Sequence, residues 1–346
     1  MVQTIFVPVL IPHRDRRHSD ATRTVPKLIG VRASRGALAA AATLASTGSA
    51  YLGVRNLLQG QAARAREVIP KAWDIPPRAD GVYSPGGGPV ERWHRGDPFD
   101  LHLMIFGDST ATGYGCRSAE EVPGVLIARG LAEQSGKRIR LSTKAIVGAT
   151  SKGLEGQIDA MFVAGPPPDA AVIMIGANDI TALNGIAPSA RRLGKAVARL
   201  RTSGAVVVVG TCPDFGVITA IPQPLRTVAR TLGLRLARAQ ASAVRAEGGV
   251  PVPFSDLLAP EFYRHPEELF SDDMFHPSAA GYALAANQLL PALCEALGEG
   301  GGDSVPEQAL RTRAADVSTL LAKVGGVTRL WRRTTGVPAP VIASAG

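Results

Sequence analysis

Residues 101–109 read LHLMIFGDS, and this stretch indicates the kind of fold to expect. A mostly apolar run of strand length ends in a glycine, an aspartate and a serine. Four further runs of strand length follow along the chain, and three of them end at a glycine or directly before one. Short β-branched runs without strict alternation indicate strands of a parallel sheet that is buried on both faces. The further runs are IRLSTKAIV (139–147), AAVIMIG (170–176), AVVVVG (205–210) and GVPVPF (249–254).

Segments with helical spacing alternate with these runs. A regular alternation of strands and helices predicts a parallel sheet with helices packed on both sides. We therefore expect an α/β domain over 98–297, a three-layer α/β/α sandwich around a central, mostly parallel five-stranded sheet of the flavodoxin-like kind. The predicted helices cover 118–135, 186–203, 225–247 and 278–297, the last of them interrupted by Pro291.

The composition excludes several classes of protein. The chain has 346 residues, 45% of them hydrophobic and 19% charged, which is enough apolar material for a sizeable core. This composition excludes disorder throughout the chain. The three cysteines, Cys116, Cys212 and Cys294, are far apart and form no CxxC pair. A disulfide-stapled scaffold, a zinc site and thioredoxin-like chemistry are therefore not expected.

The net charge of +9 lies in the flanks of the chain and not in its centre. Residues 1–97 carry 14 Lys and Arg against 7 Asp and Glu, whereas residues 98–297 carry 18 of each kind. A nucleic-acid enzyme more often carries a basic stripe on the folded domain itself. We therefore expect no nucleic-acid partner.

The flanks divide into three segments. Residues 1–58 are basic at first and then contain the Ala-rich run GALAAAATLASTGSAYLGV (36–54), which has no charge. Such a pattern is typical of a secretory signal or an N-terminal anchor, so we expect export or attachment to the cell envelope. The alternative is a surface helix packed on a cytoplasmic domain. Residues 59–97 read as an extended linker, and 298–346 as a flexible C-terminal tail.

Polar residues follow three of the predicted strands, and a fourth group precedes the last helix. Ligands bind at the carboxyl ends of the strands in a doubly wound sheet, so these residues mark the candidate site. The four groups are Gly107-Asp108-Ser109, Gly148-Ala149-Thr150, Gly176-Ala177-Asn178-Asp179 and Asp273-Met274-Phe275-His276.

Together these residues supply the parts of a nucleophilic site. A serine hydroxyl such as that of Ser109 needs a base, and His276 can supply it. Asp273, three residues before His276, can orient the second ring nitrogen of the base. The backbone N–H groups of Ser109 and Gly148 and the amide of Asn178 can donate to an oxyanion.

Each residue also has a purely structural interpretation. Ser109 alone could be a helix cap, Gly148 a turn glycine and Asn178 an Asx turn. We expect Asp179 to bond to loop backbone and take no part in chemistry. Only the DxxH spacing favours Asp273 over its neighbour Asp272, which we expect to be solvated.

The four groups, in this order over about 170 residues, resemble the four blocks of the GDSL or SGNH hydrolases. With its Ala-rich run, the chain looks like the exported GDSL-type esterases of mycobacteria and related actinobacteria. The resemblance covers roughly 98–297. It implies the SGNH-hydrolase fold, a catalytic set of Ser109, Asp273 and His276, and an oxyanion hole of Ser109, Gly148 and Asn178. Thr110 replaces the leucine of GDSL, which weakens any transfer of substrate preference.

The sequence therefore predicts a serine esterase or lipase that hydrolyses carboxylic esters of short to medium acyl chains, with no metal or organic cofactor. Its partners would be a small-molecule or lipid ester and a membrane or cell-envelope surface. The loop at 211–224, with Phe215, Val217, Ile218 and Ile221, would line an acyl pocket. One alternative is an acyltransferase that passes the acyl group to a sugar or lipid hydroxyl. Another is a non-catalytic carbohydrate- or lipid-binding module on the same fold.

Overall fold

The structure, a computed structural model, describes residues 53, 56–64, 67 and 75–299. The chain divides into two units, Met1–Asn56 and Leu57–Gly346, and the sheet belongs to the second. Nearly all of the predicted signal- or anchor-like segment and the tail from residue 300 onward lie outside the described residues. Among the residues that are described, no helix has the length and apolar character needed to cross a membrane.

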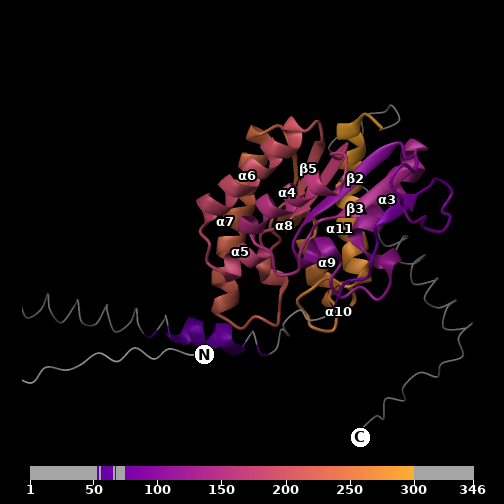
Figure 1. The fold of residues 1–346 in the computed structure, drawn as a ribbon. Coiled ribbons are helices and arrows are strands. Elements are labelled where there is room, and N and C mark those ends of the chain that lie inside the picture. Colours follow the sequence, from indigo (N-terminus) through magenta and orange to yellow (C-terminus); the bar gives the residue numbers. More distant parts are fainter. Residues whose placement is uncertain (1–52, 54–55, 65–66, 68–74, 300–346) are drawn as a thin grey trace, which may run out of the picture. The chain divides into compact units, whose positions relative to one another are not determined.

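The core of the fold is a six-stranded sheet in the order β1-β3-β2-β4-β5-β6 (Figure 1). Neighbouring strands are parallel, except that β1 runs antiparallel to β3. Without β1, the order is the flavodoxin-like one, as predicted. The strands are β1 (Gly81–Tyr83), β2 (Leu101–Gly107), β3 (Ile139–Thr143), β4 (Ala170–Met174), β5 (Val206–Gly210) and β6 (Val250–Val252).

Helices cover both faces of the sheet, which confirms the predicted three-layer architecture (Figure 1). On β2, Leu103 and Ile105 pack with α3 and α11, whereas Met104 and Phe106 pack with α4 and α6 on the other face. The longer helices are α3 (Pro123–Ser135), α4 (Leu154–Ala164), α6 (Ile186–Thr202), α7 (Leu225–Ala246) and α11 (Ala279–Leu297). The shorter ones are α2 (Ser109–Thr112), α5 (Ala177–Thr181), α8 (Phe254–Leu257), α9 (Ala259–Arg264) and α10 (Pro266–Leu269).

The sixth strand, β1, corrects the prediction of five strands and of a linker over 59–97. Val82 and Tyr83 are buried, and Val82 also exchanges two backbone hydrogen bonds with Glu91, of 2.8 and 3.1 Å. The segment therefore forms a short hairpin on the edge of the sheet. The Pro85-Gly86-Gly87-Gly88 turn dominates the local sequence and hides a strand of only three residues.

The same N-terminal segment covers a buried cation. The guanidinium of Arg140, a residue only 5% exposed, lies 3.4 Å from the ring centroid of Trp93. A desolvated cation on an aromatic face contributes about 2 kcal/mol to stability. Residues 81–100 thus belong to the folded domain and stabilise the edge of the sheet next to β3.

Two helix predictions also need correction. The region 118–135 is a 3-10 turn (Ala119–Glu121) followed by α3, because Pro123 suits the first turn of a helix and no later position. The helix α11 runs through Pro291 without interruption. Leu289 and Leu293, on either side of the proline, are fully buried, so tertiary packing outweighs the backbone hydrogen bond that the proline cannot make.

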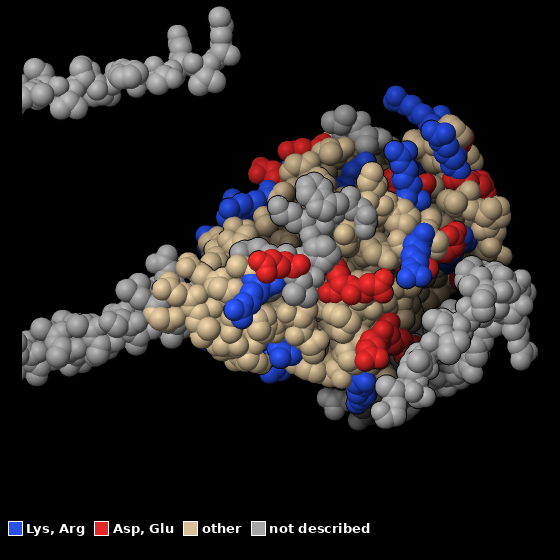
Figure 2. Space-filling model, turned by 90° about the horizontal axis from the view of Figure 1, so that it is seen from below, with Lys and Arg blue, Asp and Glu red and all other residues tan. Residues whose placement is uncertain are grey.

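The charges of the domain are mixed on the face that Figure 2 shows. Blue and red side chains lie among each other on this face, without a stripe of one sign. This distribution agrees with the equal numbers of acidic and basic residues in 98–297.

Candidate active site

The serine of the first motif stands at the end of a central strand. Ser109 begins α2 directly after β2, and Asp108 caps this helix by accepting a 3.0 Å hydrogen bond from the Thr110 N–H. Gly107 has φ +136°, and a Cβ there would lie 1.9 Å from the Met174 carbonyl oxygen, so only glycine fits. Burial raises the pKa of Asp108 to about 6, although hydrogen bonds from the Thr110 and Gly176 backbones oppose this shift.

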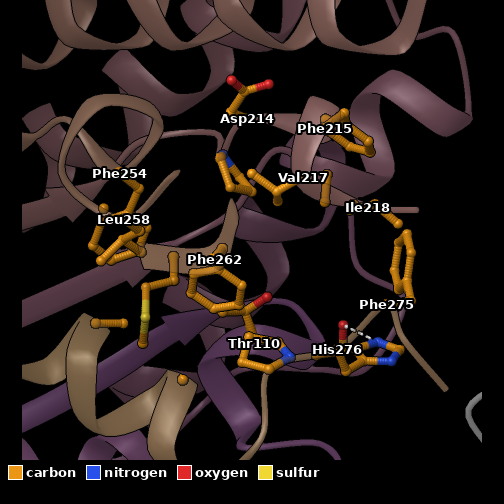
Figure 3. A pocket seen from close by; sticks show the side chains of 18 of the residues that line it. Thr110, Asp214, Phe215, Val217, Ile218, Phe254, Leu258, Phe262, Phe275 and His276 are labelled. Atoms are coloured by element: carbon orange, nitrogen blue, oxygen red, sulfur yellow. Dashed lines mark hydrogen bonds between the residues drawn. The ribbon is translucent and has the colours of Figure 1, made fainter. Parts of the chain in front are cut away.

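Ser109, His276 and Asp273 form one hydrogen-bonded chain. The Ser109 Oγ lies 3.1 Å from His276 Nε2, and His276 Nδ1 lies 2.6 Å from Asp273 Oδ2 (Figure 3 shows the first of these contacts). Because the carboxylate accepts the proton of Nδ1, Nε2 is left as an acceptor for the serine hydroxyl. These are the three residues that the sequence analysis grouped together, although Ser109 and His276 are 167 positions apart in the chain.

The second oxygen of the Asp273 carboxylate builds the turn that carries His276. Its Oδ1 accepts hydrogen bonds from the Ser271 hydroxyl and from the N–H groups of Phe275 and His276, at 2.8–2.9 Å. Burial raises the pKa of Asp273, but the hydrogen bonds from His276 and Phe275 outweigh it and hold the pKa well below its usual range. Met274 has a φ of +52°, a strained value for a residue with a side chain, which lets the turn close.

The neighbouring aspartate has a different environment. The Asp272 side chain is fully exposed, and its contact is a 3.9 Å pair with the exposed Arg117. Such a pair contributes little to stability. The geometry therefore distinguishes Asp273 from Asp272 in the way that the DxxH spacing predicts.

The candidate oxyanion donors lie on adjacent loops. The Asn178 Nδ2 donates one hydrogen bond of 2.9 Å to the Ala149 carbonyl oxygen, which leaves its second N–H for another acceptor. Gly148 has φ +78° and open space where a Cβ would be. Within the part of the chain that the structure describes, the N–H groups of Ser109 and Gly148 donate to no protein group.

Asp179 joins the loops of Gly148 and Asn178. Its buried carboxylate accepts hydrogen bonds from the backbone and hydroxyl of Ser151, at 2.8 and 2.7 Å, and from Asn184 and Ser189. This is the structural role that the sequence suggested for Asp179. The carboxylate fixes the position of the Asn178 helix relative to the turn after β3.

An apolar cavity of about 90 Å³ lies beside Ser109 and His276. In Figure 3, Phe254 and Leu258 lie on the far side of this cavity from His276, and Phe262 lies between Leu258 and His276. Phe215, Val217 and Ile218 of the predicted loop line it, whereas Ile221 is buried in the core away from it. A Cβ at Gly210 would meet the Phe254 ring at 2.4 Å, so this glycine makes room for the ring.

Sequence reasoning missed two groups of residues at the site. The walls formed by α8 and α9 had no recognisable motif. Gln157 was missed as well. Its amide oxygen accepts a 2.9 Å hydrogen bond from the Gly107 N–H, and its amide nitrogen donates one of 2.8 Å to the Gly107 carbonyl oxygen. A single Gln on the apolar face of α4, beside Leu154 and Ile158, was the available signal. In the described residues, no group of three or more His, Cys, Asp and Glu is placed to hold a metal ion.

The arrangement places a hydroxyl, a base that accepts its proton and a carboxylate that orients the base next to free N–H donors. Such a set can attack a carbonyl carbon and stabilise the negative oxygen that results.

Comparison with known proteins agrees with this chemistry. The sequence model of the GDSL-like Lipase/Acylhydrolase family matches residues 105–284. The GDSL-like esterase Rv1075c of Mycobacterium tuberculosis is 75% identical over 268 residues, 78% of this chain and 85% of that protein.

Solved structures also align with the chain. The lipase/acylhydrolase from Enterococcus faecalis is 22% identical, with a TM-score of 0.46 over 60% of this chain and all of that one. The esterase EstA from Pseudoalteromonas sp. is 21% identical, with a TM-score of 0.45 over 57% of this chain and all of that one. From the family match and the 75% identical relative, the chain belongs to the GDSL-like lipase/acylhydrolase family of ester hydrolases.

Proposed function

We propose that this protein is a serine esterase that cleaves carboxylic esters of short to medium acyl chains through an acyl-Ser109 intermediate. The observation that carries the proposal is the chain of two hydrogen bonds from the Ser109 hydroxyl through His276 to the Asp273 carboxylate. Ser109, Asp273 and His276 are its catalytic residues.

In the acylation step, the Ser109 Oγ attacks the ester carbonyl carbon while His276 Nε2 takes the hydroxyl proton. Asp273 stays ionised and stabilises the imidazolium. The negative oxygen of the tetrahedral intermediate accepts hydrogen bonds from the N–H groups of Ser109 and Gly148 and from the second amide hydrogen of Asn178. The intermediate collapses, and the alcohol leaves with the proton from His276.

Deacylation repeats these steps with water as the nucleophile. His276 Nε2 takes a proton from the water molecule as its oxygen attacks the acyl carbon. The same three donors hold the second oxyanion. When this intermediate collapses, Ser109 regains its proton from His276 and the carboxylic acid is released.

The cavity beside Ser109 supports a short acyl group. An engineered apolar cavity of about 150 Å³ holds benzene, with its six carbons. By the same ratio, the cavity of about 90 Å³ has room for about four carbons. The apolar side chains of Phe254, Leu258 and Phe262 in its lining suit a hydrocarbon.

The location of the protein is a separate part of the proposal: export, or attachment to the cell envelope, through the segment at 36–54. Its support is the basic stretch at 1–35 followed by nineteen positions without charge. Fractionation of cells that express the full chain, or the chain without residues 1–58, tests this. We expect the full chain in the envelope or the medium and the shortened chain in the cytoplasm; equal distributions would contradict the proposal.

Asp273→Asn should lower kcat about 10⁴-fold, because an amide favours the wrong tautomer of His276. The matched control is Asp272→Asn, which removes an exposed charge one residue away and should change kcat less than about twofold. Hydrolysis of a small activated ester measures both. If the Asp272 variant were the inactive one, Asp273 would have no catalytic role.

Asn178→Ala should lower kcat about 10²- to 10³-fold with KM nearly unchanged, because the lost donor binds an oxygen that is negative only in the transition state and the tetrahedral intermediate. Asn178→Asp should be at least as harmful, since a carboxylate repels the oxyanion. The control is Asn184→Ala, which loses a hydrogen bond to Asp179 and should lower the melting temperature but spare kcat. A lowered melting temperature with normal kcat in the Asn178 variant would make this residue structural.

The acyl-length profile tests the cavity. For p-nitrophenyl esters, kcat/KM should rise about fourfold for each added methylene, the gain expected from burial, until the cavity is full at about four carbons. Phe254→Ala should move the maximum to longer chains. Phe162→Ala, which changes a phenylalanine that is 54% exposed on α4, should leave the profile unchanged. A profile that rises through eight carbons in the unmodified protein would show that the acyl chain does not enter this cavity.

A further inference from the structure

A second aromatic ring, besides Phe275, contacts the base of the proposed site. The Tyr114 ring centroid lies 4.5 Å from that of His276, with the planes tilted by 52°. Both residues are buried, at 6% exposure. An imidazolium at this distance from a ring is within the range of a cation–π interaction. Phe275 belongs to the fourth motif, whereas Tyr114 lies outside all four motifs.

The backbone of Tyr114 is fixed to the nucleophile and to α11. Its N–H donates a 3.0 Å hydrogen bond to the Ser109 carbonyl oxygen, and its own carbonyl oxygen accepts one of 2.7 Å from the Tyr282 hydroxyl. Gly113 and Gly115, on either side, have φ of +72° and +90°. These two bends turn the chain sharply after α2. The ring that touches the base is therefore positioned by the same short segment that begins with the nucleophile.

We infer that Tyr114 is a positioning residue for the proposed reaction: its ring holds the His276 imidazole toward Ser109 and stabilises the imidazolium that forms when the Ser109 proton moves to Nε2. This inference rests on the proposed function. The two hydrogen bonds of His276 fix the ring nitrogens, whereas Tyr114 packs against the ring itself. The protonated ring forms only after the attack begins, so the stabilisation acts on the transition state and not on substrate binding.

The charged and titratable groups around His276 decide how the test is designed. Asp273 contacts the imidazole from its own turn, and Asp108, directly after β2, interacts with it electrostatically. Tyr282 of α11, which is buried, and Cys116, which is partly buried, lie next to Tyr114, and burial raises the pKa of both. Because burial raises the pKa of Asp108 to about 6, this carboxyl contributes to the acid limb of a pH profile as well. Only a comparison of variants that share all these groups isolates the effect of the ring.

The test compares Tyr114→Phe, which keeps the ring, with Tyr114→Leu, which fills the space without one. Tyr114→Phe should keep kcat within about twofold. Tyr114→Leu should lower kcat roughly three- to thirty-fold with KM unchanged. The acid limb of kcat/KM should move to lower pH, since the protonated ring has lost its partner. If the Leu variant does not fold, Tyr114→Met takes its place with the same expectation.

Labelling with a fluorophosphonate counts the competent molecules, so kcat is expressed per labelled site. A merely structural role would lower the labelled fraction and leave the acid limb in place. The inference is overturned if Tyr114→Leu matches Tyr114→Phe in both kcat and the acid limb. Failure of the proposed function has a different signature, because Ser109→Ala would then stay active and the unmodified protein would take no label.

Discussion

The Asp273 carboxylate makes the contacts on which the rest of the site depends. One oxygen accepts three hydrogen bonds that close the turn from Ser271 to His276, and the other accepts the bond from the imidazole. The same carboxylate thus holds the turn and contacts the imidazole. Hydrogen bonds from both favour its ionised form. In the proposed reaction, this charge would orient His276 and stabilise its imidazolium. The strained backbone at Met274 is tolerated because this carboxylate holds the turn on both sides.

The parallel sheet brings the remaining parts to the same edge. The segments that follow β2, β3 and β4 carry Ser109, Gly148 and Asn178, and the Asp179 carboxylate joins the last two segments by hydrogen bonds. Close packing at Gly107 beneath the Met174 carbonyl brings the nucleophile next to the Asn178 loop. The proposed oxyanion donors therefore have positions set by backbone geometry and by buried hydrogen bonds, which cost no reorganisation during the reaction. The Tyr114 ring adds a contact to the base from the nucleophile's own segment.

Much of this could be predicted, because the signals are local. The four longer parallel strands are apolar runs that end at glycines or turns, and the hydrogen-bonded chain of Ser109, His276 and Asp273 follows from motifs of a few residues. The parts that were missed depend on tertiary context. β1 is three residues long, and only its pairing with β3 makes it a strand. Pro291 reads as a helix breaker until its neighbours are seen to be buried. Phe254, Leu258 and Tyr114 are ordinary apolar or aromatic residues in the sequence, and only the fold places them against the cavity and the base.

The central claim is that the ester carbon becomes bonded to Ser109. The most direct test is a rapid acid quench of the protein mixed with a small activated ester, followed by peptide mass spectrometry during the first turnover. The account predicts a mass increase equal to the acyl group on the peptide that contains Ser109, formed faster than steady-state turnover and absent from the Ser109→Ala protein. Hydrolysis without any acylated peptide, or an acyl group that forms at this rate on another residue, would contradict the account.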